Sequence, residues 1–385
     1  MVKLIEITGK ALSGEWGSDD TNGNGIPVLR TTNFTNEGVV NYHNVVTRII
    51  TKKNITEKFL HSGDIIIEKS GGSDKQPVGR VVYFDGPEKT YLFNNFTGLL
   101  RVKDLSKWFP RYVFYALYAN YWRGGTRCYE NKTTGLHNLK VDDYVSRVEI
   151  KEVPIDQQIK ICHVLDTVRT LMISRKQQIT ELDNLIKARF VELFGDPVIN
   201  PHSFPKVVLS ELAEIKIGPF GSLLHKEDYI TGGHALVNPS HIIGDRVVID
   251  EDLTVTDEKY AELSAYHLQI GDVVLGRRGE MGRCAVVEEE GLLCGTGSLL
   301  IRTSGEVTAD YIQKVISFPS FKKTIEDMAV GQTMPNLNVP IVSNFQIIKP
   351  PLKVQEQYYT VVEQVDKSKV VVQKILMKYQ PYLLL

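Results

Sequence analysis

Gly63-Asp64-Ile65-Ile66 returns as Gly271-Asp272-Val273-Val274, about 208 positions later in the chain. Two further pairs of apolar blocks keep this offset, Leu4-Ile5-Glu6-Ile7 with Leu212-Ala213-Glu214-Ile215 and Val28-Leu29 with Leu236-Val237. Ordered blocks that align without a net gap indicate two copies of one structural module.

The offset between the two copies shrinks toward their ends. It is about 203 where Gly79-Arg80-Val81-Val82 meets Gly282-Arg283-Cys284-Ala285, and about 198 where Asn138-Leu139 meets Asn336-Leu337. At that last offset we align Gln157 with Gln355. The length changes fall in polar loops and leave the apolar blocks in order, as expected for two copies of one fold.

Each copy has the same order of predicted elements. A β-rich body comes first and includes apolar runs such as 64–67 and 79–84. A helical stretch, a polar loop that ends at Asn138 or Asn336, a short strand and a long helix follow. The helical stretches are residues 110–121 and 309–327, and the short strands are residues 148–153 and 345–348.

The long helices carry apolar residues at alternating spacings of three and four, which is a heptad pattern. The first helix is predicted over residues 155–194, about 60 Å at about 1.5 Å per residue. It ends at Gly195-Asp196-Pro197. Such a stripe ordinarily packs on its own domain, but its recurrence in both copies favours a pair formed between the two helices. The stripes contain Ile161, Val164, Val168, Leu171, Ile179, Leu182, Ile186 and Leu193, then Tyr358, Val361, Val365, Ser368, Val372, Ile375 and Tyr379.

The composition is typical of soluble globular units. With 385 residues, 42% of them hydrophobic, the chain suffices for two packed bodies, and its net charge of −1 argues against bulk coating of nucleic acid. Four scattered cysteines form no metal or disulfide pattern. Neither a signal peptide nor a membrane-spanning run is found, so we expect a cytoplasmic protein.

Catalytic motifs are not found. Gly71-Gly72-Ser73-Asp74-Lys75 has the composition of a phosphate loop but the wrong spacing. No methyltransferase tetrapeptide or nucleotide-binding glycine motif occurs, and carboxylates such as Glu6 and Asp64 are expected to be ordinary surface groups. We therefore predict a non-catalytic protein without a metal or other cofactor.

Polar loops at matching places in the two copies are the candidate binding elements. They carry the residue types that hydrogen-bond base edges and phosphates, although a solvated loop is the ordinary alternative for any single residue. The candidate DNA-binding residues are Arg30, Thr32 and Asn33 with Asn238, Ser240 and His241; Lys69 and Ser70 with Arg277 and Arg278; and Arg123, Arg127, Lys132 and Thr133 with Gln332 and Thr333.

Charge supports DNA binding unevenly between the copies. Residues 46–141 contain 16 Lys and Arg against 8 Asp and Glu, the excess that phosphate binding needs. Residues 207–350 contain 12 against 20. The second copy is therefore expected to keep its acids on a face away from DNA, with Arg277, Arg278 and Arg283 on the other.

Several blocks, taken in order, are typical of one family. They are Leu212-Ala213-Glu214-Ile215-Lys216-Ile217-Gly218-Pro219-Phe220-Gly221-Ser222, the Gly-Asp and Gly-Arg blocks, Pro154-Ile155-Asp156-Gln157-Gln158 and residues 182–190. With them the chain resembles the specificity (S) subunits of type I restriction-modification systems over nearly its whole length. Residues 10–25 of the first copy depart from the Pro-Phe-Gly-Ser form.

The resemblance implies an α+β fold with two tandem β-rich target-recognition domains, at residues 1–153 and 197–350. A long helix follows each domain, at residues 154–196 and 351–385, and the two helices form an antiparallel coiled coil with pseudo-two-fold symmetry. Each body would read one half of an asymmetric, split site in double-stranded DNA, and the helices would set the spacing. Two modification (methyltransferase) subunits and the restriction (endonuclease and translocase) subunits would be the partners.

Two alternatives remain open from the sequence. One is the recognition subunit of a related restriction or phage-exclusion system that uses the same module with other catalytic partners. The other is a scaffold that binds protein only, which the acidic second copy suits and the basic loops of the first do not.

Overall fold

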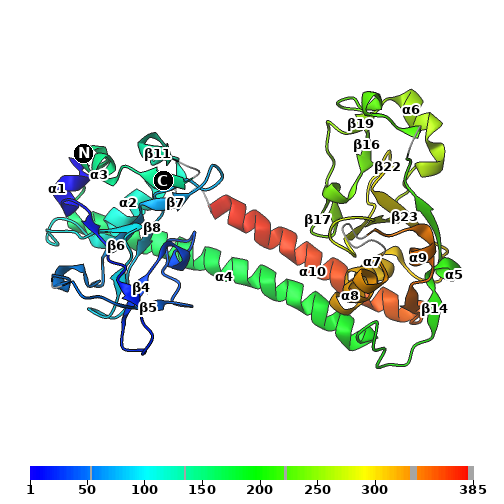
Figure 1. The fold of residues 1–385 in the computed structure, drawn as a ribbon, viewed down its shortest axis with the longest axis horizontal. Helices are drawn as coiled ribbons and strands as arrows, with labels where there is room; N and C mark the ends of the chain where they lie inside the picture. Colours follow the sequence, from blue (N-terminus) through cyan, green and yellow to red (C-terminus); the bar gives the residue numbers. More distant parts are fainter. Residues whose placement is uncertain (53, 134–135, 221–222, 330–335, 380–385) are drawn as a thin grey trace. The chain divides into compact units, whose positions relative to one another are not determined.

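The protein is described from a computed structural model that covers residues 1–52, 54–133, 136–220, 223–329 and 336–379. It divides into two compact units (Figure 1). Unit 1 comprises the described residues of Met1–Ile179 and Val370–Leu385, and unit 2 is Thr180–Lys369. Both units are mixtures of helix and sheet, as the sequence predicts.

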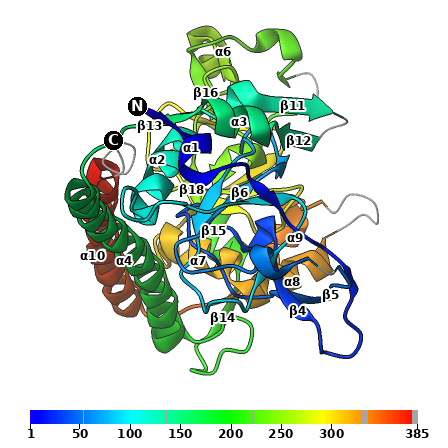
Figure 2. The ribbon, with the colours of Figure 1, turned by 90° about the vertical axis from the view of Figure 1, so that its left-hand side faces the viewer.

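Unit 1 holds the first half of the secondary structure. Its helices are α1 (Leu4–Thr8), α2 (Pro110–Trp122), α3 (Val141–Arg147) and the first part of α4 (Ile155–Phe194). Its strands are β1 (Val2–Lys3), β2 (Leu12–Ser13), β3 (Ser18–Asp19), β4 (Ile26–Leu29), β5 (Val46–Ile49), β6 (Ile65–Glu68), β7 (Ser70–Gly72), β8 (Val81–Tyr83), β9 (Leu92–Phe93), β10 (Thr97–Leu100), β11 (Glu130–Thr133), β12 (Leu136–Leu139) and β13 (Glu149–Ile150). Figure 2 shows the paired β11 and β12 next to α3.

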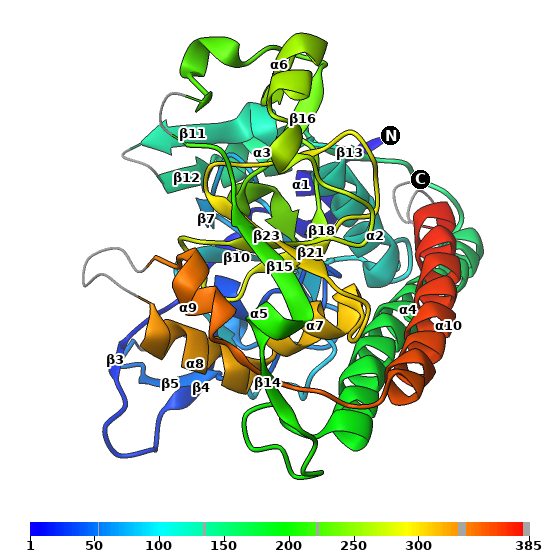
Figure 3. The same cartoon turned by 90° about the vertical axis from the view of Figure 1, so that its right-hand side faces the viewer.

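Unit 2 repeats this order with more helix. Its helices are the last part of α4, α5 (Leu209–Leu212), α6 (Asp257–Glu262), α7 (Ala309–Ser317), α8 (Pro319–Met328), α9 (Val339–Ser343) and most of α10 (Leu352–Tyr379). Its strands are β14 (Lys206–Val208), β15 (Ala213–Ile217), β16 (His234–Val237), β17 (Ile242–Ile243), β18 (Arg246–Val247), β19 (Thr254–Val255), β20 (Val273–Gly276), β21 (Cys284–Val286), β22 (Leu293–Cys294), β23 (Ser298–Thr303) and β24 (Gln346–Ile348). The adjacent β15 and β23 are visible in Figure 3.

The two units share one sheet topology, which confirms the repeat. Unit 1 has a four-stranded sheet in the order β2-β10-β6-β8, and unit 2 has β15-β23-β20-β21. In each unit a strand pairs in parallel with a later one, β4 with β9 and β16 with β22. A short strand at the start of each unit also pairs with one just before the long helix, β1 with β13 and β14 with β24.

The Gly-Asp block builds the same buried ion pair in both units. Gly63 has φ 97° and Gly271 has φ 89°, in the left-handed region that favours glycine. Asp64 then forms a two-point contact with Arg101 (Nε–Oδ1 2.7 Å, Nη2–Oδ2 2.6 Å), and Asp272 forms one with Arg302 (2.8 and 2.7 Å). Each aspartate also accepts a hydrogen bond from the backbone three residues earlier.

The expectation that Asp64 is a surface group is therefore wrong, although Glu6 is exposed as expected. Asp64 is only 1% exposed, and a buried carboxylate requires both a counter-charge and hydrogen bonds. The hydrogen bond that Arg101 donates to Asp64 in turn raises the pKa of Arg101, and the bond that Arg302 donates to Asp272 raises the pKa of Arg302 in the same way.

Apolar residues of α4 contribute to the cores of both units. Cys162 belongs to the core of unit 1, with Phe114 and Tyr144 among its members. Phe190 and Phe194 belong to the core of unit 2, where their rings contact Tyr311 and Tyr358. Each body therefore needs part of a long helix to complete its interior.

The first long helix has the predicted bounds, Ile155–Phe194. It ends where Gly195 adopts φ 71°, as the Gly-Asp-Pro signal predicts. Within unit 2 its last part runs antiparallel to α10, because Asp183 pairs with Lys369 (2.5 Å) while Phe190 contacts Tyr358 (Figure 1).

The predicted apolar stripe is wrong at two positions. Val164 is 63% exposed and Ser368 is exposed, while Cys162 and Lys369 take more buried places. In unit 1 the helix also packs against its own body, through Leu165 and Met172, so its buried face is rotated from a heptad seam.

Two further predictions need correction. The helical stretch at residues 309–327 is two helices, because Pro319 has no backbone N–H to continue α7 and instead starts α8. The residue equivalent to Gln355 is Gln158, not the exposed Gln157. Gln158 and Gln355 are both fully buried, and each accepts a hydrogen bond from the backbone at the start of the helix after the sheet, at Phe109 and Thr308.

Candidate nucleic-acid interface

Lys69 and Arg277 occupy the same place in the two units, directly after the central strand. The backbone N–H of Lys69 donates to Phe96 O (2.8 Å), and that of Arg277 donates to Gly297 O (2.9 Å). Their carbonyls accept from Leu139 N (2.8 Å) and Leu337 N (3.0 Å). The fold thus delivers one basic residue per unit to an equivalent, firmly bonded position.

The two basic side chains are held differently. Lys69 Nζ donates to Ser13 Oγ (2.7 Å), and partial burial lowers the pKa of Lys69. Arg277 Nε donates to Leu337 O (3.0 Å), and burial followed by repulsion from Arg278 lowers the pKa of Arg277. Arg278 itself is exposed. Ser70 continues from Lys69 as the first residue of β7, and its N–H also donates to Phe96 O (3.2 Å).

The loop after β4 forms a 3₁₀ turn, Thr31–Asn33, that matches Pro239–His241 after β16. Asn33 is 2% exposed, and its amide serves the backbone: Oδ1 accepts from Arg30 N (3.0 Å) and Nδ2 donates to Asn41 O (2.9 Å). His241 is 6% exposed, with Nδ1 donating to Leu236 O (2.8 Å). These two candidates therefore shape their loops.

Other candidates in these turns face outward. Thr32 and Ser240 are exposed at equivalent positions. Arg30 donates from Nη2 to Asn44 O (3.0 Å), while its buried Nε has no hydrogen-bond partner among the described residues. Asn238 Oδ1 accepts a long hydrogen bond from Gly297 N (3.4 Å).

The arginine of each Gly-Arg block supports the 3₁₀ turn. Arg80 donates to Thr31 O (3.3 Å), and Arg283 donates to Pro239 O (3.2 Å). Arg80 also forms a two-point pair with the buried Glu68 (3.0 Å each), and although burial opposes its charge, this pair raises the pKa of Arg80. Arg283 instead pairs with the exposed Glu280 (2.9 Å).

A short turn before the last strand of each sheet joins the first two candidate groups. In unit 1 it is 94–97: Asn94 N donates to Leu29 O (2.9 Å), beside Arg30, and Phe96 O accepts from Lys69 and Ser70. In unit 2 it is 295–298: Gly295 N donates to Val237 O (3.0 Å), and Gly297 O accepts from Arg277.

The sequence reasoning missed the residues of these turns. Asn95 and Phe96 are exposed, and Thr296 is half-buried. The sequence does contain a signal for these turns, because residues 92–101 align with residues 293–302. The aligned segments are Leu92-Phe93-Asn94-Asn95-Phe96-Thr97-Gly98-Leu99-Leu100-Arg101 and Leu293-Cys294-Gly295-Thr296-Gly297-Ser298-Leu299-Leu300-Ile301-Arg302. Both segments keep the first leucine, the hydroxyl residue, the leucine two positions after it and the final arginine.

The third candidate group of unit 1 contains Arg123, Arg127, Lys132 and Thr133, and a small sheet links its strand β11 to Ser70. The three-stranded sheet β11-β12-β7 places Asn138 opposite Ser70. Arg123 and Arg127 are exposed at the end of α2 and just after it. Lys132 and Thr133 lie in β11, where only the backbone is described, and Gln332 and Thr333 lie outside the described residues.

Acidic side chains near the turn of unit 2 are matched by basic ones. A hollow of about 300 Å³ there is lined in part by Asp245, Glu280 and Lys322. Asp245 pairs with Lys314 (3.2 Å), and Glu280 pairs with Lys322 (3.0 Å) as well as Arg283. The acidic excess of this copy is thus balanced at this edge of the candidate loops.

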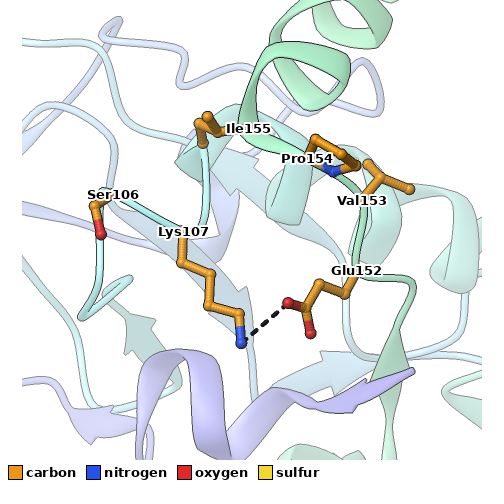
Figure 4. A pocket seen from close by; sticks show the side chains of 6 residues that line it. All are labelled: Ser106, Lys107, Glu152, Val153, Pro154 and Ile155. Atoms are coloured by element: carbon orange, nitrogen blue, oxygen red, sulfur yellow. Dashed lines mark ion pairs between the residues drawn. The ribbon is translucent and has the colours of Figure 1, made fainter.

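An open hollow in unit 1, of about 540 Å³, lies apart from the candidate residues at the start of α4 (Figure 4). Lys107 and Glu152 pair across it (3.0 Å), and the matching pair in unit 2, Glu306 with Lys349, has the opposite polarity. Both pairs fasten the segment before a long helix to the loop that precedes α2 or α7.

The described residues offer no metal centre or membrane span. Over the ranges given above, no three His, Cys, Asp or Glu side chains gather to hold a metal ion. Likewise, among the described helices none is long and apolar enough to cross a membrane. The four cysteines are free, and Cys128 is the exposed one.

A family model described as the type I restriction modification DNA specificity domain matches residues 2–184 and again residues 203–376. The chain belongs to this family. Its function is DNA-sequence specificity, and the family is one of recognition rather than catalysis. A comparison with curated proteins gives no match.

Solved structures of the family share the fold. The type I restriction-modification S subunit from M. genitalium is 15% identical, with 99% of this chain and 94% of that one covered and a TM-score of 0.58. A chain from a structure that concerns complex assembly and conformational transition of the type I R-M system is 14% identical, with 100% and 96% covered and a TM-score of 0.58.

Proposed function

We propose that this specificity subunit reads an asymmetric, split DNA sequence, with one half contacted by each unit. The observation that carries the proposal is the pair of equivalent, backbone-anchored positions with different side chains. Lys69 of unit 1 corresponds to Arg277 of unit 2, and Arg30 corresponds to Asn238. One scaffold that presents different hydrogen-bonding groups would read two different half-sites.

Within this proposal the candidate residues divide by exposure. Thr32, Ser240, Arg278, Arg123 and Arg127 are exposed, and they would contact bases or phosphates. Arg30, Lys69, Ser70, Asn238 and Arg277 are half-buried, so they would act at short range. Asn33 and His241 would act by positioning. Lys132, Thr133, Gln332 and Thr333 remain candidates from the sequence.

The partners in this proposal are double-stranded DNA, two modification subunits and restriction subunits. The modification and restriction subunits would methylate and cleave the DNA, and the complex would act in the cytoplasm. The family assignment supports this division, because the matching model is described as a DNA specificity domain. The proposed segments are residues 1–153 and 197–350 for the two recognition domains, with spacers at 154–196 and 351–385. The continuous 40-residue α4 suits a spacer role.

The main test exchanges the second recognition body, residues 207–350, for that of another specificity subunit. Methylome sequencing of cells that carry the active complex should show that one half of the methylated motif changes and the other stays. A change in both halves would contradict the modular assignment. Absence of any new split motif with the unmodified protein would instead favour a scaffold that binds protein only.

A second test concerns spacing. Inserting one heptad into the first helix and a matching one into the second should lengthen the unread gap between the half-sites and leave both half-sites unchanged. An unchanged gap would contradict the spacer role.

A further inference from the structure

Asn95 and Phe96 lie at the tip of the turn that joins two candidate groups of unit 1. Phe96 is 52% exposed, so about half of a large apolar ring is left in contact with water instead of being buried. A single exposed apolar side chain is ordinary on a protein surface. Phe96 differs because its own carbonyl accepts from both Lys69 (2.8 Å) and Ser70 (3.2 Å), which places it among the candidate DNA contacts.

The turn holds these two residues rigidly. Asn94 and Thr97 on either side are 4% and 0% exposed. Thr97 donates from its backbone N (3.1 Å) and from Oγ1 (2.8 Å) to Asn94 O, and Asn94 N donates to Leu29 O (2.9 Å). Because the backbone is fixed, little conformational entropy is lost when the tip binds a ligand.

The matching turn of unit 2 does not present such groups. Gly297 stands where unit 1 has Phe96, and a Cβ there would lie 2.9 Å from Pro239 Cδ. The turn therefore packs directly on the 3₁₀ turn and has no room for a ring. Thr296, equivalent to Asn95, is half-buried. The two turns therefore differ both in shape and in the side chains that they present.

The two side chains have complementary preferences for one base pair. A carboxamide matches the N7 acceptor and N6 donor of adenine, and an apolar ring suits the 5-methyl group of thymine; both lie in the major groove. No partner for the Asn95 side chain occurs among the described residues, so its amide is free to bind. We propose that Asn95 and Phe96 read an A·T base pair in the half-site of unit 1. This inference rests on the proposed DNA-reading function.

The test uses the complex with its modification subunits and a duplex that carries its methylated motif. Each thymine of the motif is replaced in turn by uracil, which lacks the methyl group. The unmodified complex should bind about 3- to 10-fold more weakly at one thymine of the first half-site, the effect of losing one buried methyl group. Phe96→Ala should bind the thymine and uracil duplexes equally, and Phe96→Leu should keep part of the difference. Asn95→Ala should relax the preference for adenine in the same pair by about 10-fold.

Leu105→Ala is the matched control, because Leu105 is an exposed apolar residue of the same unit (65%) outside the candidate loops. It should leave the thymine-to-uracil ratio unchanged. The inference is overturned if Phe96→Ala keeps the full ratio, or if it lowers only the assembly of the complex, which would make Phe96 a protein contact. If the unmodified complex binds no split motif, the proposed function fails instead.

Discussion

Unit 1 and unit 2 both hold their 3₁₀ turn with an arginine, but the carboxylate that pairs with this arginine differs between them. In both, an arginine from the Gly-Arg block holds the first carbonyl of the 3₁₀ turn, at Thr31 or Pro239. In unit 1 the buried Glu68 neutralises that arginine, but unit 2 has Gly276 at that position and uses the exposed Glu280 instead. The hydrogen bond that shapes the loop is kept while the charges around it change.

This difference shows which contacts define the module. The Asp–Arg pair, the backbone bonds of Lys69 and Arg277 and the buried Gln158 and Gln355 occur in both units. Several side chains between these anchors differ, such as Arg30 against Asn238 and Phe96 against Gly297. A module of this kind can change the sequence that it reads without changing its fold.

The largest expected effect tests whether the shared ion pair is equivalent in both units. Asp64→Asn and Asp272→Asn should each destabilise their own unit by about 3 kcal/mol, because each leaves an arginine without its buried counter-charge. Native-state hydrogen exchange measures this for each unit separately, through the amides of β6 and β20. Glu6→Gln, at an exposed carboxylate, is the control. A large effect in one unit and none in the other would show that the pairs are not equivalent.

The next comparison concerns the carboxylates that differ. Glu68→Gln should cost about 2 kcal/mol, because Glu68 is 2% exposed and makes two charge-assisted hydrogen bonds. Glu280→Gln should cost less than about 1 kcal/mol, as expected for exposed ion pairs. The same exchange measurement applies. Equal losses would mean that the two arginines are held with the same strength.

The third comparison concerns DNA binding. Arg277→Ala and Arg278→Ala should each weaken binding by about 1–3 kcal/mol and relax the second half-site, whereas Lys69→Ala should act on the first. Lys187→Ala, at an exposed lysine of α4, is the control. Competition binding with duplexes altered in one half-site distinguishes these outcomes. If all four variants lose the same affinity for every duplex, the basic residues contribute only phosphate attraction.

The smallest effect depends on pH and is confined to unit 1. Hydrogen bonds from Lys52 (2.8 Å) and Lys58 (2.5 Å) lower the pKa of Glu15. In unit 2 the matching residue is Pro219, because it follows Gly218, which lies against Gly295 O as Gly14 lies against Asn94 O. A lowered pKa stabilises the fold above the unfolded value of about 4.3, and that stabilisation is lost as pH falls through the folded value. Glu15→Gln should therefore lower the stability of unit 1 by less than about 1 kcal/mol at pH 7. The difference should shrink as pH falls below about 4.3 and through the folded pKa of Glu15, and a difference that stays constant over this range would contradict the assignment.

The repeat and the long helix were predictable from the sequence because each rests on local pattern. Apolar blocks in fixed order predicted the shared sheets, and Gly195-Asp196-Pro197 predicted the end of α4. Residues whose environment depends on distant segments were predicted less well. Asp64 was assigned to the surface because its partner, Arg101, is 37 positions away. Val164 was assigned to a helix–helix seam from its heptad spacing. The contacts of α4 with the body of unit 1, which decide the buried face there, do not follow that spacing.

The candidate site was predictable as a set of loops rather than as individual contacts. Side-chain type drew attention to Asn33 and His241, but the structure uses both to close their own turns. Asn95 and Phe96 were missed because nothing in their residue types marks a turn that joins two other loops. Only the hydrogen bonds to Leu29, Lys69 and Ser70 show that connection.

The composition of unit 1 has a consequence for biosynthesis. Its body is encoded first, yet it includes the part of α10 from Val370 onward, with Val372 buried. About 190 residues separate the two parts, so at about 5–20 residues per second a ribosome needs on the order of 10–40 s between them. Unit 2, which is contiguous, is itself complete only at Lys369, directly before Val370. The unit that emerges earliest is therefore completed last, and an interrupted translation product would leave part of α4 uncovered.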